Sequence, residues 1–186
     1  MPDAFFTKRL ILTEPDTALA EERLQYYSRN REFFEKYDAN ICDENLTPEK
    51  QADILSGEMK LMQSNRGLYY YFFLRDDPDH IAGTLSVSNV RPLPRSCAAF
   101  GYDLDRILWG QGYAFEACSF AINELFATTS IHRLESYIHT GNERSKALIE
   151  RLGFTKEGIM RESIMIQGAF RDHMLYALIN KNDRAG

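Results

Sequence analysis

Two glycines separated by one residue stand directly before the clearest predicted helix of the sequence. The segment reads Trp109-Gly110-Gln111-Gly112-Tyr113-Ala114. The first amides of a helix lack intrahelical partners and lie at the positive end of its dipole, and glycines leave them accessible. The segment therefore predicts a site for a diphosphate. Glycines there can also be plain turn residues, and the sequence has no Gly-x-Gly-x-x-Gly dinucleotide loop or Gly-Lys-Ser/Thr phosphate loop around this segment.

A second cluster follows about 30 residues later, one strand–helix crossover further along the chain. It consists of Asn142, Ser145, Leu148 and the run Leu152-Gly153-Phe154. Asparagine is a favoured N-cap and glycine a favoured helix stop, so the cluster predicts a helix between Asn142 and Gly153. Capping alone would explain Asn142, and a first-turn hydroxyl would explain Ser145.

Together and at this spacing, the two clusters resemble the GNAT superfamily of acetyltransferases. The likeness is greatest to its ribosomal-protein N-terminal acetyltransferase branch, the RimJ/RimL type. The run Arg9-Leu10-Ile11-Leu12 and Asp172 are also similar to that branch, and the likeness extends roughly from Thr7 to Asn180. It implies an enzyme that moves acetyl from acetyl-CoA directly to a primary amine, without a covalent intermediate. The implied acceptors are a protein N-terminal α-amine, a polyamine, an amino sugar or another small amine.

The resemblance also implies where acetyl-CoA lies. In this family the strand before the loop splays away from the strand after the helix, and the pantetheine amides pair with the exposed strand edge. The diphosphate falls on the loop amides, and the later asparagine contacts the cofactor. The implied cofactor-binding residues are Tyr102, Asp103, Leu104, Trp109, Gly110, Gln111, Gly112, Tyr113, Ala114, Asn142 and Ser145.

One departure concerns the proton donor for the leaving thiolate. Many members carry a tyrosine one residue after the helix leucine, but here that position is Ile149, which has no proton to donate. In the RimJ/RimL branch the serine of the second cluster is the proposed donor, which implies Ser145 as catalytic acid. A non-catalytic acyl-CoA-binding sensor is the alternative function, and Ile149 favours it while Ser145 argues against it.

The base and the acceptor site are less determined. Glu135 is the candidate base, acting through a water, because it is expected on the strand beside the cleft. His139 is a second candidate, since histidine titrates near neutral pH. The family builds acceptor walls from its early helices, which implies Glu35 as an acceptor-binding residue. The cations that could meet the 3′-phosphate of coenzyme A are Arg106, Arg144 and Lys146.

Periodicity predicts the elements that must position these residues. Strands are expected at 9–12, 68–75, 81–88, 98–104, 133–138, 156–165 and 171–179. The first helix should bury Ala20, Leu24 and Tyr27, residues 31–39 form a second short helix or a loop, and a long helix begins at Thr47 and ends at Gly67. The order β-α-α-β-β-β-α-β-α-β-β predicts an α/β fold with a mixed sheet. We expect one domain over 1–186, with its core at about 7–180.

Bulk composition limits the function classes. A net charge of −5 gives no general attraction to nucleic acid or anionic membranes and would favour a cationic substrate. Cys42, Cys97 and Cys118 show no disulfide or metal-site spacing, the histidines show no ligand spacing, and no signal pattern or long apolar run occurs. We therefore expect a cytoplasmic protein without a metal, as a monomer or homodimer.

Overall fold

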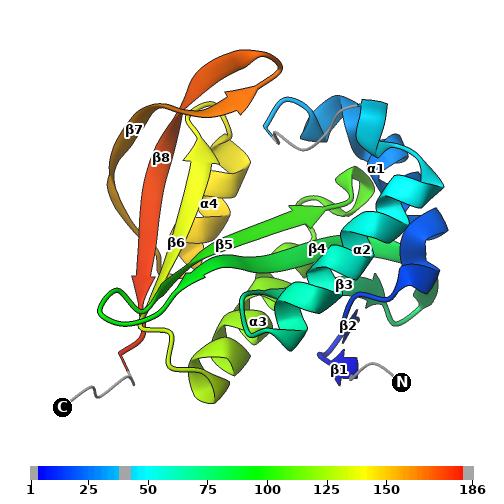
Figure 1. Ribbon diagram of the computed structural model, residues 1–186, viewed down its shortest axis with the longest axis horizontal. Helices are drawn as coiled ribbons and strands as arrows, with labels where there is room; N and C mark the ends of the chain where they lie inside the picture. Colours follow the sequence, from blue (N-terminus) through cyan, green and yellow to red (C-terminus); the bar gives the residue numbers. More distant parts are fainter. Residues whose placement is uncertain (1–3, 38–42, 182–186) are drawn as a thin grey trace.

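One mixed sheet of eight strands, in the order β1-β2-β3-β4-β5-β6-β8-β7, runs through the molecule (Figure 1). The computed structural model describes residues 4–37 and 43–181. All neighbouring strands are antiparallel except β5 and β6. The strands are β1 (Ala4–Phe6), β2 (Leu10–Thr13), β3 (Leu68–Leu74), β4 (Asp77–Arg91), β5 (Cys97–Leu104), β6 (Arg133–His139), β7 (Thr155–Ile166) and β8 (Ala169–Ile179).

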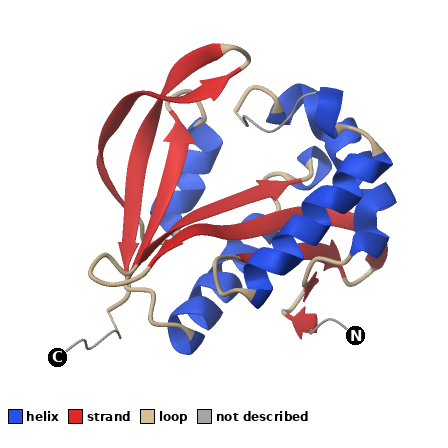
Figure 2. Ribbon diagram, in the orientation of Figure 1, coloured by secondary structure: helices blue, strands red, loops and turns tan. Residues whose placement is uncertain are grey.

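Helices cover both faces of this sheet (Figure 2). Tyr26 and Leu55 are fully buried where α1 and α2 pack on β3 and β4. The main core, which includes Phe100, Cys118 and Ile149, packs α3 and α4 against the other face. No helix in the described residues combines the length and apolarity that crossing a membrane requires. The α-helices are α1 (Ala20–Phe34), α2 (Pro48–Gln63), α3 (Tyr113–Thr128) and α4 (Glu143–Arg151), and short 3-10 turns occupy Thr17–Leu19, Asp43–Asn45 and Arg106–Leu108.

The predicted order of elements is confirmed, with β1 as an additional edge strand. Residues 31–34 form no separate helix, because α1 continues through Phe34; residues 38 and 39 of that segment lie outside the described residues. The helix expected to end at Gly67 ends at Gln63, and Asn65 rather than Gly67 takes the positive φ, 55°. A Cβ at position 67 would lie 2.6 Å from the Tyr69 ring, so the glycine serves a close approach instead.

The sheet opens between β5 and β6. The two strands pair in parallel over three residue pairs, the last being Ala99 with Glu135. Beyond that pair β5 stays with β4 as far as Leu104, while β6 stays with β8 as far as His139. Figure 1 shows the two strands side by side at their starts and diverging toward their ends. The predicted splay is thus present, and we call the space between these ends the wedge.

Candidate active site

The loop between β5 and α3 presents bare amides at the wedge. Gly110 and Gly112 have φ of 76° and 83°, values that favour glycine, and Gly112 is the N-cap of α3. A Cβ at Gly110 would meet nothing within 4 Å, so the space in front of it is open. Among the described residues, no hydrogen bond to the protein is donated by the amides of 110–114. The loop therefore has the donors and the space that a diphosphate needs.

Arg9, directly before β2, binds the loop between β5 and α3 through its side chain. Its Nη1 donates to the Gln111 carbonyl at 3.0 Å, and its guanidinium lies 4.1 Å from the centre of the Tyr113 ring. Its Nε forms an ion pair of 2.7 Å with Glu116 in the first turn of α3. Burial would raise the pKa of Glu116, but hydrogen bonds from Thr7 and Arg9 outweigh it and hold the pKa below its ordinary value. The contact between Arg9 and Gln111 joins residues 102 positions apart, a separation that no local sequence pattern predicts.

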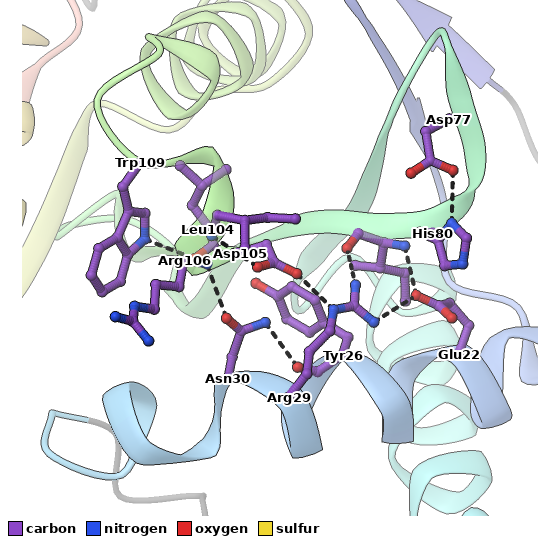
Figure 3. Close-up of polar contacts among 12 residues, drawn as sticks. Glu22, Tyr26, Arg29, Asn30, Asp77, His80, Leu104, Asp105, Arg106 and Trp109 are labelled. Carbon is purple, nitrogen blue, oxygen red and sulfur yellow. Dashed lines mark hydrogen bonds and ion pairs between the residues drawn. The ribbon is translucent and has the colours of Figure 1, made fainter.

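Helix α1 fixes the other end of the loop (Figure 3). Asn30 Oδ1 accepts from the Arg106 amide at 2.9 Å, and Arg29 Nε donates to Asp105 at 2.7 Å. The Trp109 indole Nε1 donates to the Leu104 carbonyl at 3.1 Å. This carbonyl of β5 is therefore satisfied by the protein itself, so the backbone contact that the resemblance implies at Leu104 would have to come from its amide or from its neighbours.

Tyr102 on β5 and Ser145 on α4 meet across the wedge. The Tyr102 hydroxyl donates to Ser145 Oγ at 3.2 Å. Asn142 caps α4, since its Oδ1 accepts from the Ser145 amide at 3.1 Å. Burial raises the pKa of the Tyr102 phenol, against the opposing effect of its bond to Ser145, so the phenol stays protonated. The sequence indicated Ser145 as the acid but placed Tyr102 only as a backbone contact.

Both candidate bases, Glu135 and His139, already accept hydrogen bonds from the protein. Glu135 Oε1 accepts from Arg133 at 2.8 Å and Oε2 accepts from the Tyr137 hydroxyl at 2.6 Å. Burial would raise the pKa of Glu135, but these bonds and the charge of Arg133 outweigh it and lower the pKa. His139 Nδ1 accepts from the Gly141 amide at 3.0 Å, so neutral His139 has its proton on Nε2 and offers a donor rather than a base.

The three cations predicted to bind the 3′-phosphate differ in their present partners and in their distance from the loop. Lys146 Nζ donates to the Thr140 carbonyl at 2.9 Å and pairs with Glu143 at 2.6 Å. The Arg106 guanidinium lies 4.1 Å from the Phe33 ring centre, on the side of α1. Arg144 lies 3.4 Å from the centre of the Trp109 ring, which places its charge beside the diphosphate loop. Arg144 therefore has the most suitable position of the three.

Glu35, predicted at the acceptor site, lies at the end of α1. Its Oε2 accepts from Arg31 Nε at 3.3 Å, four residues earlier. The nearby Tyr37 ring lies 5.4 Å from the His139 ring at the end of β6. The end of α1 thus approaches the open end of the wedge, where an acceptor would enter.

Cys97 and Cys118 are free and buried, and Cys42 lies outside the described residues. Within residues 4–37 and 43–181, no group of three or more His, Cys, Asp or Glu side chains is placed to hold a metal ion. Among the described residues, the candidates for chemistry at the wedge are the loop amides, the Tyr102–Ser145 pair and Glu135.

Comparison with known proteins agrees with this geometry. The ribosomal protein uS5-alanine N-acetyltransferase of Escherichia coli is 30% identical over 172 residues, which cover 92% of this chain and 88% of that protein. The structure of the ribosomal-protein-S5-alanine acetyltransferase from Vibrio fischeri matches with a TM-score of 0.91 at 26% identity, over 98% and 99% of the two chains. A RimL ribosomal L7/L12 α-N-protein acetyltransferase, solved in complex with coenzyme A, shares the fold, with a TM-score of 0.85 at 23% identity over 95% and 98% of the chains. The family model for the acetyltransferase (GNAT) domain matches residues 9–155. This match spans most of the sequence, and the chain belongs to the GNAT family of acetyltransferases.

Proposed function

We propose that this GNAT N-acetyltransferase uses acetyl-CoA to acetylate a primary amine, by direct transfer within the wedge. One observation carries the proposal: β5 and β6 part beyond Ala99 and Glu135, beside a loop whose amides have no partner in the described protein. The pantetheine arm would enter the wedge as a pseudo-strand, and the diphosphate would bind the loop amides with Arg144 alongside. Metal chemistry is not required by this route.

The reaction is the aminolysis of a thioester. The neutral amine nitrogen forms a bond to the acetyl carbon, the C–S bond breaks, and the amine loses a proton. The departing thiolate needs a proton, and Ser145 is our proposed donor. The phenol of Tyr102 donates to Ser145 Oγ, which directs the serine proton away from the phenol. As Oγ gives its proton to the thiolate it takes the phenol proton, and solvent then returns a proton to the phenol.

This arrangement bears on the departure at Ile149. That side chain is fully buried in the main core and, being aliphatic, has no proton to donate. The phenol that many family members place on this helix is supplied here from the opposite wall, by Tyr102. This observation favours a catalytic enzyme over the acyl-CoA-binding sensor.

Glu135 remains our proposed base, working through a water molecule. Because Arg133 and Tyr137 lower its pKa, it is ionised throughout the neutral range but is a weak proton acceptor. We therefore expect Glu135 to contribute only modestly to the rate of acetyl transfer. We also propose that the enzyme acts in the cytoplasm. For the acceptor we propose a protein N-terminus or a small amine, and the names of two relatives, which are ribosomal-protein acetyltransferases, support the protein acceptor.

The test combines calorimetry with acetyl-CoA and an assay of free thiol release with a panel of amines and N-terminal peptides. We expect binding of acetyl-CoA and thiol release that depends on the acceptor. Binding without release on any acceptor would establish the sensor instead. No binding would remove both functions.

A further inference from the structure

A cavity of about 470 Å³ lies between α2 and the strands β3, β4 and β5. Three hydroxyl side chains of β4, those of Thr84, Ser86 and Ser88, line it. Every second residue of a strand points to the same face, which places these three side chains in one row along β4. The cofactor and proton-transfer contacts described above do not involve these hydroxyls.

The three hydroxyls differ in their partners. The Thr84 hydroxyl lies 3.5 Å from Asp103 Oδ2. Among the described residues, no hydrogen bond joins the hydroxyl of Ser86 or of Ser88 to another part of the protein, although both residues are half-buried. A serine hydroxyl carries one donor and two acceptor positions. Ser86 and Ser88 can therefore bind a polar group that enters the cavity.

The charged side chains that α1 and α2 contribute to the cavity bind each other. Arg23 Nε donates to the Tyr71 hydroxyl at 2.7 Å, and that hydroxyl donates to Glu58 Oε2 at 2.7 Å. Arg23 Nη2 also lies 3.8 Å from Glu58. These groups satisfy one another, whereas the two serines on the opposite wall offer neutral hydrogen-bonding groups.

The pairing of β4, β5 and β6 connects the two serines with the wedge. Ser88 pairs with Ala99, which pairs in turn with Glu135, the proposed base. Two residues further toward the open end, Ser86 pairs with Gly101. Paired residues of neighbouring strands point to the same face of the sheet. On this face β5 carries only a methyl group and a hydrogen at these two positions, so a molecule can lie across the strand between the wedge and the serines.

Strand spacing sets the length of such a molecule. Neighbouring strands lie about 4.8 Å apart, so the side chains of β4 are about 7 Å from the midline between β5 and β6. A side-chain hydroxyl on the second residue of an extended peptide lies about this far from the N-terminal amine, as does a hydroxyl on the far side of a six-membered ring from its amine.

We propose that Ser86 and Ser88 bind a hydroxyl group of the acceptor, so that the enzyme prefers primary amines that carry a hydroxyl about 7 Å away. The inference rests on the proposed acetyl transfer. A hydroxyl can both donate to and accept from the serines, whereas an apolar group would leave them without partners. Two kinds of molecule share this chemistry: a cyclic amino alcohol such as an amino sugar, and a peptide whose second residue is serine or threonine.

The activity test compares acceptors that differ in one hydroxyl. The pairs are trans-4-aminocyclohexanol with cyclohexylamine, and an Ala-Ser peptide with an Ala-Ala peptide of equal length. We expect kcat/KM to be about fivefold higher for the hydroxylated member of at least one pair, and the responding pair identifies the source. Equal kcat/KM within both pairs would overturn the proposal.

The serines are tested together. The double variant Ser86→Ala/Ser88→Ala should reduce the ratio of kcat/KM within the responding pair to about one. Ser56→Ala, which alters a serine of α2 outside the cavity lining, should preserve the ratio. Because the ratio compares two acceptors on the same protein, a general loss of activity does not change it. A ratio that survives in the double variant would overturn the proposal.

Gly101 gives a second, independent variant. A Cβ at this position would lie 3.0 Å from Ser86 Oγ, so Gly101→Ala places a methyl group where the acceptor would cross β5. This variant should also lower the ratio within the responding pair. Gly158→Ala in β7, where a Cβ would meet nothing within 4 Å, is the matched control and should preserve it. The same ratio in both glycine variants would mean that the acceptor does not cross β5 at this point.

A binding measurement separates this inference from the proposed function. Without acetyl-CoA, we expect a hydroxylated acceptor to raise the Tm of the wild-type protein more than its partner does, and this difference to vanish in the double serine variant. If no amine is acetylated but the difference is found, the transfer reaction is wrong and the hydroxyl site stands. If transfer occurs without any hydroxyl preference or Tm difference, only the hydroxyl site is wrong.

Discussion

The hydroxyl of Tyr102 on β5 lies 3.2 Å from Ser145 Oγ on α4, so one hydrogen bond joins the two walls of the wedge. The two residues come from elements that α3 and β6 separate in the chain. Ser145 lies in the first turn of α4, where its backbone amide donates to the cap residue Asn142, so both the amide and the hydroxyl of Ser145 have a partner. This relationship yields the first prediction.

Ser145→Ala should lower kcat about 100-fold, within the usual range for loss of a general acid, and Tyr102→Phe about tenfold. If Tyr102 acts through Ser145, the double variant will be no slower than Ser145→Ala alone. Steady-state kinetics give the rates, and calorimetry gives the Kd of acetyl-CoA for each variant, which separates a loss of turnover from a loss of cofactor binding. Ser64→Ala, at the exposed end of α2, is the hydroxyl control. Fully additive effects would mean that Tyr102 acts independently of Ser145.

The phosphate loop can be tested with a pair of glycines. Gly112→Ala and Gly168→Ala both place a Cβ on a residue with positive φ, 83° and 76°, at a cost of about 1 kcal/mol each. Both should reduce the free energy of unfolding similarly. Only Gly112→Ala should raise the Kd of acetyl-CoA, about tenfold, because Gly168 lies in the β7–β8 turn. Equal Kd values in the two variants would contradict the loop assignment.

The Arg9–Glu116 pair makes a pH-dependent contribution to stability. The folded pKa of Glu116 lies below its ordinary value of 4.5, so its contribution is present above that value and is lost as pH falls through the folded pKa. Glu116→Gln should therefore lower the free energy of unfolding by about 1 kcal/mol at pH 7. In urea titrations the difference from wild type should shrink below pH 4.5. A difference that does not change with pH would mean that packing, not charge, is responsible.

Arg133 allows a matched test of the base, because it pairs with both Glu135 and Glu157. Glu135→Gln should lower kcat about tenfold if its carboxylate accepts a proton through water. Glu157→Gln removes the other partner of Arg133 and should leave kcat unchanged. Because its pKa is lowered, Glu135 stays ionised from pH 9 to about pH 6. Across that range kcat/KM should therefore fall only because the acceptor amine becomes protonated. Equal losses of kcat in the two variants would mean that Glu135 serves as an ion-pair partner of Arg133 and not as a base.

Local patterns in the sequence predicted the elements and the loop. Strand alternation, the helical repeat of α3, the Thr47 and Asn142 caps and the two glycine-containing clusters each depend on residues a few positions apart, where periodicity and capping rules apply. The same patterns, with the family resemblance, predicted the splay and placed Ser145 in the site. On α1 they were right for Tyr27, which is buried, and for Ala20, which packs on the core, but wrong for Leu24, which is only partly buried. Arg23 and Asn30 are buried there instead, because each has hydrogen-bond partners inside the fold.

The sequence by itself thus determined the order of strands and helices and the position of the glycine loop before α3. Tertiary structure alone decided which side chains complete the site. The Arg9–Glu116 pair spans 107 residues and the Tyr102–Ser145 bond spans 43, and no spacing rule reaches so far. Such contacts depend on how elements pack and on where a sheet opens, and both arise only when distant segments share one core.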